Sequence, residues 1–163
     1  MQFGELCQTA HELRVPTWID SAGTPVEPLR LADLGNGYKI IYCFQHWCRG
    51  CHSRGFPMLR YLHDRLSDRG VGFAAIQTVF EGAAVNTVDK LRVNQERYGL
   101  KMPFGHDMPA DGADYSSFMA DYQSGGTPWF TLIDPADRVV FADFQIDPAR
   151  FLHALETMQD RGR

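Results

Sequence analysis

Apolar residues along the chain gather in short continuous runs, and the segments between these runs carry apolar residues at helical spacing. Residues Lys39 to Gln45 and Val71 to Phe80 are apolar at most positions, which is typical of strands covered on both faces of a sheet. Trp129 to Ile133 and Val139 to Phe144 are separated by Asp134-Pro135-Ala136-Asp137, so we expect an antiparallel hairpin there.

Segments with apolar residues at helical spacing lie between these strands. The longest helix is expected from Cys48 to Asp68, with Leu59, Leu62 and Leu66 on its buried face and a kink at Pro57. Further helices are expected at 5–13, from Asn86 or Thr87 to Tyr98, from Ser116 to Tyr122, and from the cap Asp147-Pro148 to Gln159. Met102 to Asp107 is expected to be a short strand or loop.

The first part of the chain predicts an extension of the sheet. Trp18 to Val26 is expected to form two short edge strands around a turn at Asp20, and Leu31 to Leu34 a turn or 3₁₀ segment. We therefore predict a single α/β domain over 1–163: a β-hairpin extension in 1–37 and, in 38–163, a central mixed sheet with helices on both faces.

Composition narrows the possible partners. The formal net charge is −4 and the two signs are interspersed, which argues against nucleic acid as a partner. No run of about eighteen apolar residues occurs and the N-terminus lacks the pattern of a secretion signal, so we expect a cytoplasmic protein without a membrane partner.

Chemistry is concentrated in Trp47-Cys48-Arg49-Gly50-Cys51-His52, which follows an apolar strand and opens a helix. A thiol at a helix N-terminus loses its proton more easily, because the free N–H groups and the helix dipole favour an anion. Cys51 lies within reach of a mixed disulfide formed on Cys48 and could resolve it. Arg49 adds a positive charge beside the thiolate, and Gly50 leaves space for a partner.

Other interpretations of the pair are weaker. Structural zinc needs four ligands and no second close pair of cysteines exists, so no metal site is expected. Cys48-Arg49-Gly50-Cys51-His52 matches the haem-attachment pattern, but a buried strand before it is not the setting for haem, and no cofactor is expected. Of the other two cysteines, we interpret Cys43 as a small buried apolar residue and Cys7 as an idle thiol.

A second motif, Gly125-Gly126-Thr127-Pro128-Trp129, precedes the last hairpin. A cis peptide bond at Pro128 would place the backbone of Thr127 opposite Cys48. An extended substrate peptide could then pair with that backbone while its sulfur meets Cys48.

With these two motifs the sequence resembles the thioredoxin-fold superfamily, and more narrowly the TlpA/ResA-like thiol–disulfide oxidoreductases and related redoxin (AhpC/TSA-like) domains. The resemblance covers nearly the whole chain. It implies a thioredoxin-like fold, with Cys48 as attacking thiolate, Cys51 as resolving thiol, Pro128 as cis-proline and Trp47 as the aromatic flank of the sulfur.

The sequence departs from this family at the proton acceptor for Cys51. Thioredoxin has a buried carboxylate in the central strand where this chain has Tyr42, and TlpA/ResA-like proteins often have a glutamate shortly after the second cysteine. Here that region is His52-Ser53-Arg54-Gly55, with one extra residue before Pro57. His52, His46 and Glu81 remain candidates for the acceptor.

The sequence thus predicts an enzyme that reduces protein disulfides through Cys48 and Cys51, with a disulfide-containing protein as substrate and an upstream electron donor. A peroxiredoxin-like peroxidase is disfavoured, because Gln45 stands where that chemistry needs threonine. A non-catalytic redox switch and a haem- or metal-binding module are the remaining alternatives.

Overall fold

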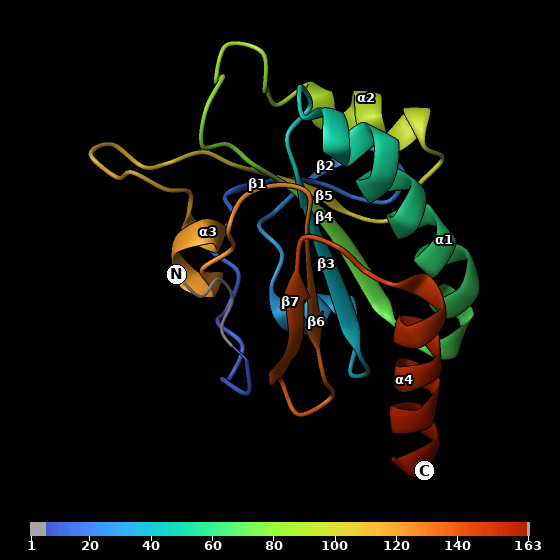
Figure 1. The fold of residues 1–163 in the computed structure, drawn as a ribbon. Helices are drawn as coiled ribbons and strands as arrows, with labels where there is room; N and C mark the ends of the chain where they lie inside the picture. The colour runs from blue at the N-terminus through green and yellow to red at the C-terminus, as the bar shows by residue number, and fades with distance from the viewer. Residues whose placement is uncertain (1–5, 163) are drawn as a thin grey trace.

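A seven-stranded mixed sheet forms the centre of the protein, in a computed structural model that describes residues 6–162. Its order is β2-β1-β5-β4-β3-β6-β7 (Figure 1). β3, β4 and β5 run parallel, whereas β1, β6 and β7 pair antiparallel with their neighbours. The strands are β1 Thr17–Ile19, β2 Pro25–Val26, β3 Lys39–Phe44, β4 Gly72–Thr78, β5 Phe104–Asp107, β6 Trp129–Ile133 and β7 Val139–Asp143.

Helices cover both faces of this sheet, as the sequence predicts. They are α1 Phe56–Leu66, α2 Lys90–Arg97, α3 Ser117–Tyr122 and α4 Pro148–Arg161. α1, α2 and α4 lie on one side of the sheet and α3 lies on the other (Figure 1). The predicted α/β architecture, a central mixed sheet with helices on both faces, is therefore confirmed.

β3 lies between β4 and β6 inside the sheet and leads directly to the cysteine motif. Ile40, Tyr42 and Phe44 face the side of α1, whereas Ile41 and Cys43 belong to the core on the side of α3. All six residues of the strand are buried, because helices cover both faces. Cys43 is a buried free thiol, as predicted.

The helix after the cysteine motif contains an irregular turn. Helical backbone begins at Arg49, but Cys51–Gly55 is a π-helical turn in which the N–H of Phe56 donates to the carbonyl of Cys51. A π turn accommodates one extra residue, and the sequence has one extra residue before Pro57. The irregularity expected at Pro57 thus lies in the turn just before it, and Pro57 stands in the first turn of α1.

The predicted β-hairpin extension joins the sheet at its β5 edge. The Asp20 carboxylate accepts hydrogen bonds from the N–H groups of Ala22 and Thr24, which closes the turn between β1 and β2. The 3₁₀ segment Leu31–Leu34 is present and places Leu31 and Leu34 in the core.

The helix predicted over 5–13 is wrong for 6–13, and residue 5 lies outside the described residues. This segment runs without helix beside the β6–β7 hairpin. The N–H of Cys7 donates to the carbonyl of Val139, and the N–H of Val139 donates to the carbonyl of Gln8. The backbone hydrogen bonds of this segment are therefore made with a hairpin that is far away in the sequence. Helix propensity depends on neighbouring residues, so it cannot reveal this pairing.

The helix predicted from Asn86 or Thr87 begins later, at Lys90. Asn86 is fully buried and hydrogen-bonds to the cysteine loop instead of capping the helix. The prediction of Asn86 as a cap is thus wrong, because a side chain from another segment competes for its amide. The predicted hairpin β6–β7 and the Asp147 cap of α4 are present.

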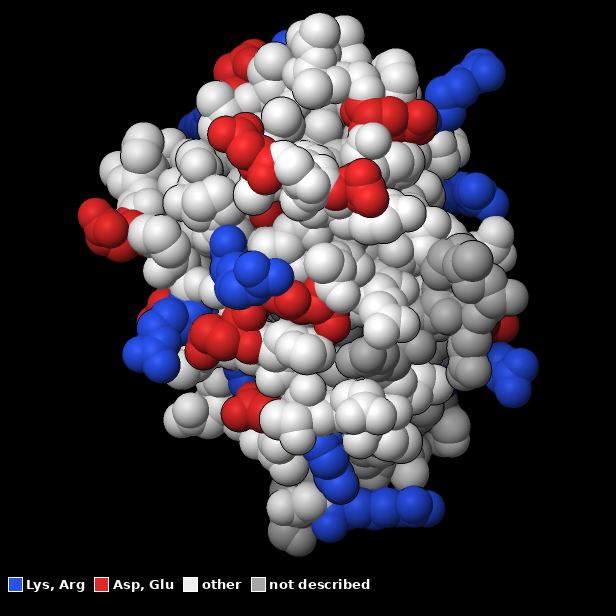
Figure 2. All heavy atoms as spheres, turned by 90° about the vertical axis from the view of Figure 1, so that its left-hand side faces the viewer, with Lys and Arg blue, Asp and Glu red and all other residues white. Residues whose placement is uncertain are grey.

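Within residues 6–162, no helix is both long enough and apolar enough to cross a bilayer. Figure 2 shows the face over α3, which carries both acidic and basic side chains.

Candidate active site

Cys48 and Cys51 form a disulfide at the carboxyl end of β3. Their Cα atoms lie 5.3 Å apart. The N–H of Cys48 donates to the carbonyl of Gln45, and this turn brings the chain from the strand into the helix. Cys51 is fully buried and Cys48 is half-buried, so a partner reaches the Cys48 sulfur first.

The Cys48 sulfur is surrounded by polar backbone groups. The N–H of Cys51 donates to Cys48 Sγ at 3.2 Å. In the reduced protein, such a donor stabilises the thiolate over the thiol and lowers the pKa of Cys48. On the other side, Sγ lies 3.7 Å from the carbonyl oxygen of Thr127. The geometry is thus arranged for thiol–disulfide exchange at Cys48.

The Thr127–Pro128 peptide bond is cis, as the sequence predicts. Pro128 is buried against the helix start: a Cβ atom on Gly50 would lie 3.4 Å from Pro128 Cδ. The two motifs, 79 residues apart in the sequence, therefore meet at the sulfur of Cys48.

Tyr42 stands where thioredoxin has its buried carboxylate, and it has a different role. Its hydroxyl donates to the carbonyl of Cys51 at 3.0 Å. Burial raises the pKa of Tyr42 well above its usual value, so the side chain stays a neutral donor. Tyr42 therefore supports the π turn and does not accept a proton from Cys51.

Two histidines lie beside the disulfide and hydrogen-bond to other groups. The carbonyl of His46 accepts from His52 Nε2–H, and the other ring nitrogen of His52 pairs with the Tyr98 hydroxyl. His46 Nδ1 accepts from the Asn94 amide, and burial is the main reason that its pKa is lowered. Within residues 6–162, no side chain hydrogen-bonds to the sulfur of Cys51. His52, His46 and the exposed Glu81 stay predictions as acceptors.

Comparison with solved structures identifies the family. A thioredoxin-like superfamily protein of known crystal structure is 32% identical, with a TM-score of 0.80 over 91% of this chain and 94% of that one. The chain belongs to the thioredoxin-like superfamily. A thiol-disulfide isomerase from Corynebacterium glutamicum is 28% identical, with a TM-score of 0.76 over 91% of this chain and 95% of its own.

A more distant structure has the same fold. The thioredoxin domain of a thiol-disulfide oxidoreductase from Bacteroides vulgatus is 17% identical, with a TM-score of 0.68 over 92% of this chain and 96% of that chain. No protein-family model and no curated protein sequence matches the chain.

In this thioredoxin-like protein, Trp47 is held by the loop that contains Glu81, a contact that the sequence analysis did not predict. Its ring is 48% exposed and covers Gly82, where a Cβ atom would lie 2.8 Å from the ring. The N–H of Trp47 donates to the side-chain oxygen of Asn86, whose amide donates to the carbonyls of Glu81 and Gly82. Asn86 thus ties the 81–86 loop to the residue before Cys48.

Gln45 stands at the position where a peroxiredoxin needs threonine, and its side chain hydrogen-bonds to the same loop. Its side-chain oxygen accepts from the N–H of Phe80 and the amide of Asn86. Gln45 therefore positions the loop. In the described part of the chain, no group of three or more histidine, cysteine or acidic residues is arranged to hold a metal ion.

Two arginines stand at or near the cysteine motif. Arg49 is exposed and forms no ion pair within residues 6–162. Arg54, which the sequence analysis did not single out, reaches back to the cysteine motif: a Cβ atom on Gly50 would lie 3.3 Å from its Nη2. Gly50 and Arg54 are four residues apart, and residues at this spacing share one face of a helix, so the helix expected from Cys48 could have indicated this contact.

Proposed function

We propose that this thiol–disulfide oxidoreductase reduces disulfide bonds in partner proteins, with Cys48 as the attacking thiolate and Cys51 as the resolving thiol. The observation that carries the proposal is the environment of Cys48 Sγ, which is half-buried, receives the Cys51 N–H and faces the Thr127 carbonyl. The relatives named as thiol-disulfide isomerase and oxidoreductase support the same chemistry.

The reaction has two exchange steps. The Cys48 thiolate attacks one sulfur of the substrate disulfide, the substrate S–S bond breaks, and the released substrate thiolate takes a proton from solvent. Cys51 then gives its proton to solvent, and its thiolate attacks the Cys48 sulfur. The bond between Cys48 and the substrate breaks, and the second substrate thiolate leaves and takes a proton from solvent. Two electrons pass to the substrate and the enzyme is left as the Cys48–Cys51 disulfide. An upstream dithiol donor restores the reduced pair.

Substrate backbone would be held by Thr127. An extended peptide that pairs with this residue by strand addition places its own sulfur opposite Cys48. Trp47 and Gly50 border the sulfur, one as an exposed apolar surface and the other as a place where backbone can approach closely.

We also propose that the reaction takes place in the cytoplasm. Cys7 and Cys43 are free thiols and Cys7 is exposed, which suits a reducing compartment. A reducing setting favours the reductive direction.

The test is to trap the mixed disulfide. The Cys51→Ser variant should accumulate a covalent adduct on Cys48 with a disulfide-bonded model protein such as insulin, whereas Cys48→Ser should form none. Cys7→Ser is the matched control and should reduce insulin like the wild type. Adducts on Cys51 in the Cys48→Ser variant, or wild-type protein that does not reduce insulin, would refute the assigned roles.

A further inference from the structure

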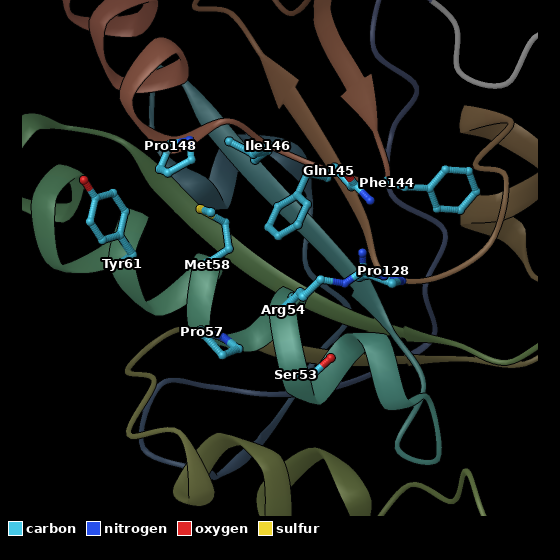
Figure 3. Close-up of a pocket in the computed structure, with 12 residues that line it drawn as sticks. Ser53, Arg54, Pro57, Met58, Tyr61, Pro128, Phe144, Gln145, Ile146 and Pro148 are labelled. Atoms are coloured by element: carbon cyan, nitrogen blue, oxygen red, sulfur yellow. The ribbon is translucent and has the colours of Figure 1, made fainter.

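A groove beside the disulfide is unused by the chemistry described so far. It has a volume of about 390 Å³ and lies between the π turn with α1 on one side and the β7–α4 connection on the other (Figure 3). Pro128, whose peptide bond faces Cys48, forms one end of it. A peptide held at Thr127 therefore enters this groove as it leaves the sulfur.

The groove is mainly apolar. Met58 and Tyr61 are only partly buried although they are large and apolar, and Phe130 and Ile146 form its buried wall. The Phe144 ring points away from these residues (Figure 3) and packs against Trp129. A surface of this kind accepts a large apolar side chain, because burial of that side chain removes apolar area on both partners from water.

Arg54 is the single charged residue of the lining. Its side chain points toward Pro128 (Figure 3), and Nη2 would lie 3.3 Å from a Cβ atom on Gly50. Arg54 is exposed and forms no ion pair within residues 6–162. The carboxylates of Asp143 and Asp147 stand on the neighbouring connection, outside the lining, and accept hydrogen bonds from the N–H groups of Phe144 and Arg150. An unpaired guanidinium at the edge of an apolar groove suits a carboxylate, which it can bind through two parallel hydrogen bonds.

We propose that this groove selects peptide substrates in which an acidic residue and a large apolar residue lie close to the disulfide-bonded cysteine. The acidic side chain binds Arg54 next to Gly50, and the apolar side chain lies against Met58, Tyr61 and Ile146. The proposal rests on the function proposed above, since the peptide is the substrate whose sulfur meets Cys48. Arg54 is thus a specificity-determining residue.

The test compares short blocked peptides, each a symmetric disulfide dimer, for their rate of exchange with the reduced protein. One peptide carries phenylalanine and glutamate within three residues of its cysteine. A second has lysine in place of glutamate, and a third has alanine in place of phenylalanine. Each rate is divided by the rate of the same protein variant with the small neutral disulfide bis(2-hydroxyethyl) disulfide.

For the wild type, we expect the glutamate peptide to react about five-fold faster than the lysine peptide at low salt, with a smaller ratio at high salt. Arg54→Glu should bring this ratio to one or below. Arg60→Glu makes the same charge change on an exposed position of α1 outside the lining, and it should keep the wild-type ratio. Met58→Ala should lower the advantage of phenylalanine over alanine about three-fold, whereas Met108→Ala, which is exposed and outside the groove, should not.

The outcomes separate the two proposals. Equal rates for all peptides, or a charge preference that Arg54→Glu leaves unchanged, would overturn the role of the groove while the exchange itself stands. The exchange rate with glutathione disulfide is measured for the same variants. If Arg54→Glu lowers this rate more than it lowers the rates with the peptides, the site serves a small anionic disulfide, and the peptide assignment is overturned. No exchange with the neutral disulfide would refute the proposed function, and the groove proposal with it.

Discussion

The hydroxyl of Tyr42 occupies the space that a side chain at Gly55 would need. A Cβ atom at Gly55 would lie 2.2 Å from the Tyr42 oxygen and 2.9 Å from Pro128 Cβ. The same hydroxyl donates to the carbonyl of Cys51. Tyr42 therefore joins the central strand, the π turn and the cis-proline in one contact below the disulfide.

Substitution of Gly55 should therefore destabilise the protein. We expect Gly55→Ala to lower the free energy of unfolding by about 2 kcal/mol, because neither buried neighbour has room to move. Chemical denaturation measures this change. Gly162→Ala is the matched control, since a Cβ atom there meets nothing closer than 3.6 Å. Adding Tyr42→Phe to Gly55→Ala should recover part of the loss, and a purely additive double variant would show that the two residues are not coupled.

Loss of the Asn86 side chain should loosen the loop that holds Trp47. Asn86→Ala removes the acceptor of the Trp47 N–H and the donor to the carbonyls of Glu81 and Gly82, so we expect a loss of about 2 kcal/mol in unfolding free energy. The rate of disulfide exchange should fall as well, and both are measurable on the purified variant. Asn36→Ala, at an exposed position, is the control. An Asn86→Ala protein with wild-type stability would mean that water replaces the amide at no cost.

Three histidines should make the protein less stable as the pH falls. Burial lowers the pKa of His46, His63 and His106 below the usual value. The folded state therefore binds fewer protons than the unfolded state. The contribution of the three neutral histidines to the free energy of unfolding is complete above about pH 6.5, the usual pKa of histidine. It is lost as the pH falls from there through their lower pKa values in the folded state.

The urea midpoint measured at pH 7.5 and at pH 5.5 tests this. At His106 the ring Nδ1 pairs with the Gln77 amide, so protonation removes an acceptor from a buried donor. His106→Asn should show a smaller loss of midpoint between the two pH values than the wild type. His153→Gln, on an exposed position of α4, should behave like the wild type, and equal losses in both variants would contradict the assignment.

Asp107 acts in the opposite direction at lower pH. Burial raises the pKa of this carboxyl, although the N–H of Phe118 and the hydroxyl of Ser117 partly oppose the shift. The folded state binds the proton more tightly than the unfolded state. The stabilisation by protonated Asp107 is therefore complete below about pH 4, and it is lost as the pH rises through the pKa that Asp107 has in the folded state.

The difference in unfolding free energy between Asp107→Asn and wild type isolates this effect. It should shift in favour of the variant as the pH rises from about 4, the usual pKa of aspartate, through the raised folded pKa of Asp107, and then level off. Asp143→Asn, at the exposed end of β7, should show no such trend. A difference that is constant with pH would mean that Asp107 titrates alike in both states.

Much of the fold follows from local pattern. β3, β4 and the β6–β7 hairpin are the longest apolar runs, and helical spacing with a proline or an aspartate at its start marks α1 and α4. The cysteine pair and Thr127-Pro128 were recognisable because each motif is short and its chemistry depends on residue type. Where neighbours in sequence decide the conformation, the prediction and the structure agree.

Other parts depended on distant partners. Residues 6–13 have apolar spacing that fits a helix, yet backbone groups of the β6–β7 hairpin hold them in a non-helical path. Asn86 has the side chain of a helix cap, yet Trp47 and Gln45 compete for it. Tyr98, predicted only as part of a helical stripe, pairs with His52 beside the disulfide.

The sequence by itself determined the strands, the main helices and the chemistry of the Cys48–Cys51 pair, because these depend on residue type and on spacing within a few residues. Only the tertiary structure decided that Tyr42 supports the π turn, that Asn86 holds the loop under Trp47, and that Arg54 stands beside an apolar groove. These contacts form between segments far apart in the chain, where buried polar groups take whichever partner packing brings within hydrogen-bond distance.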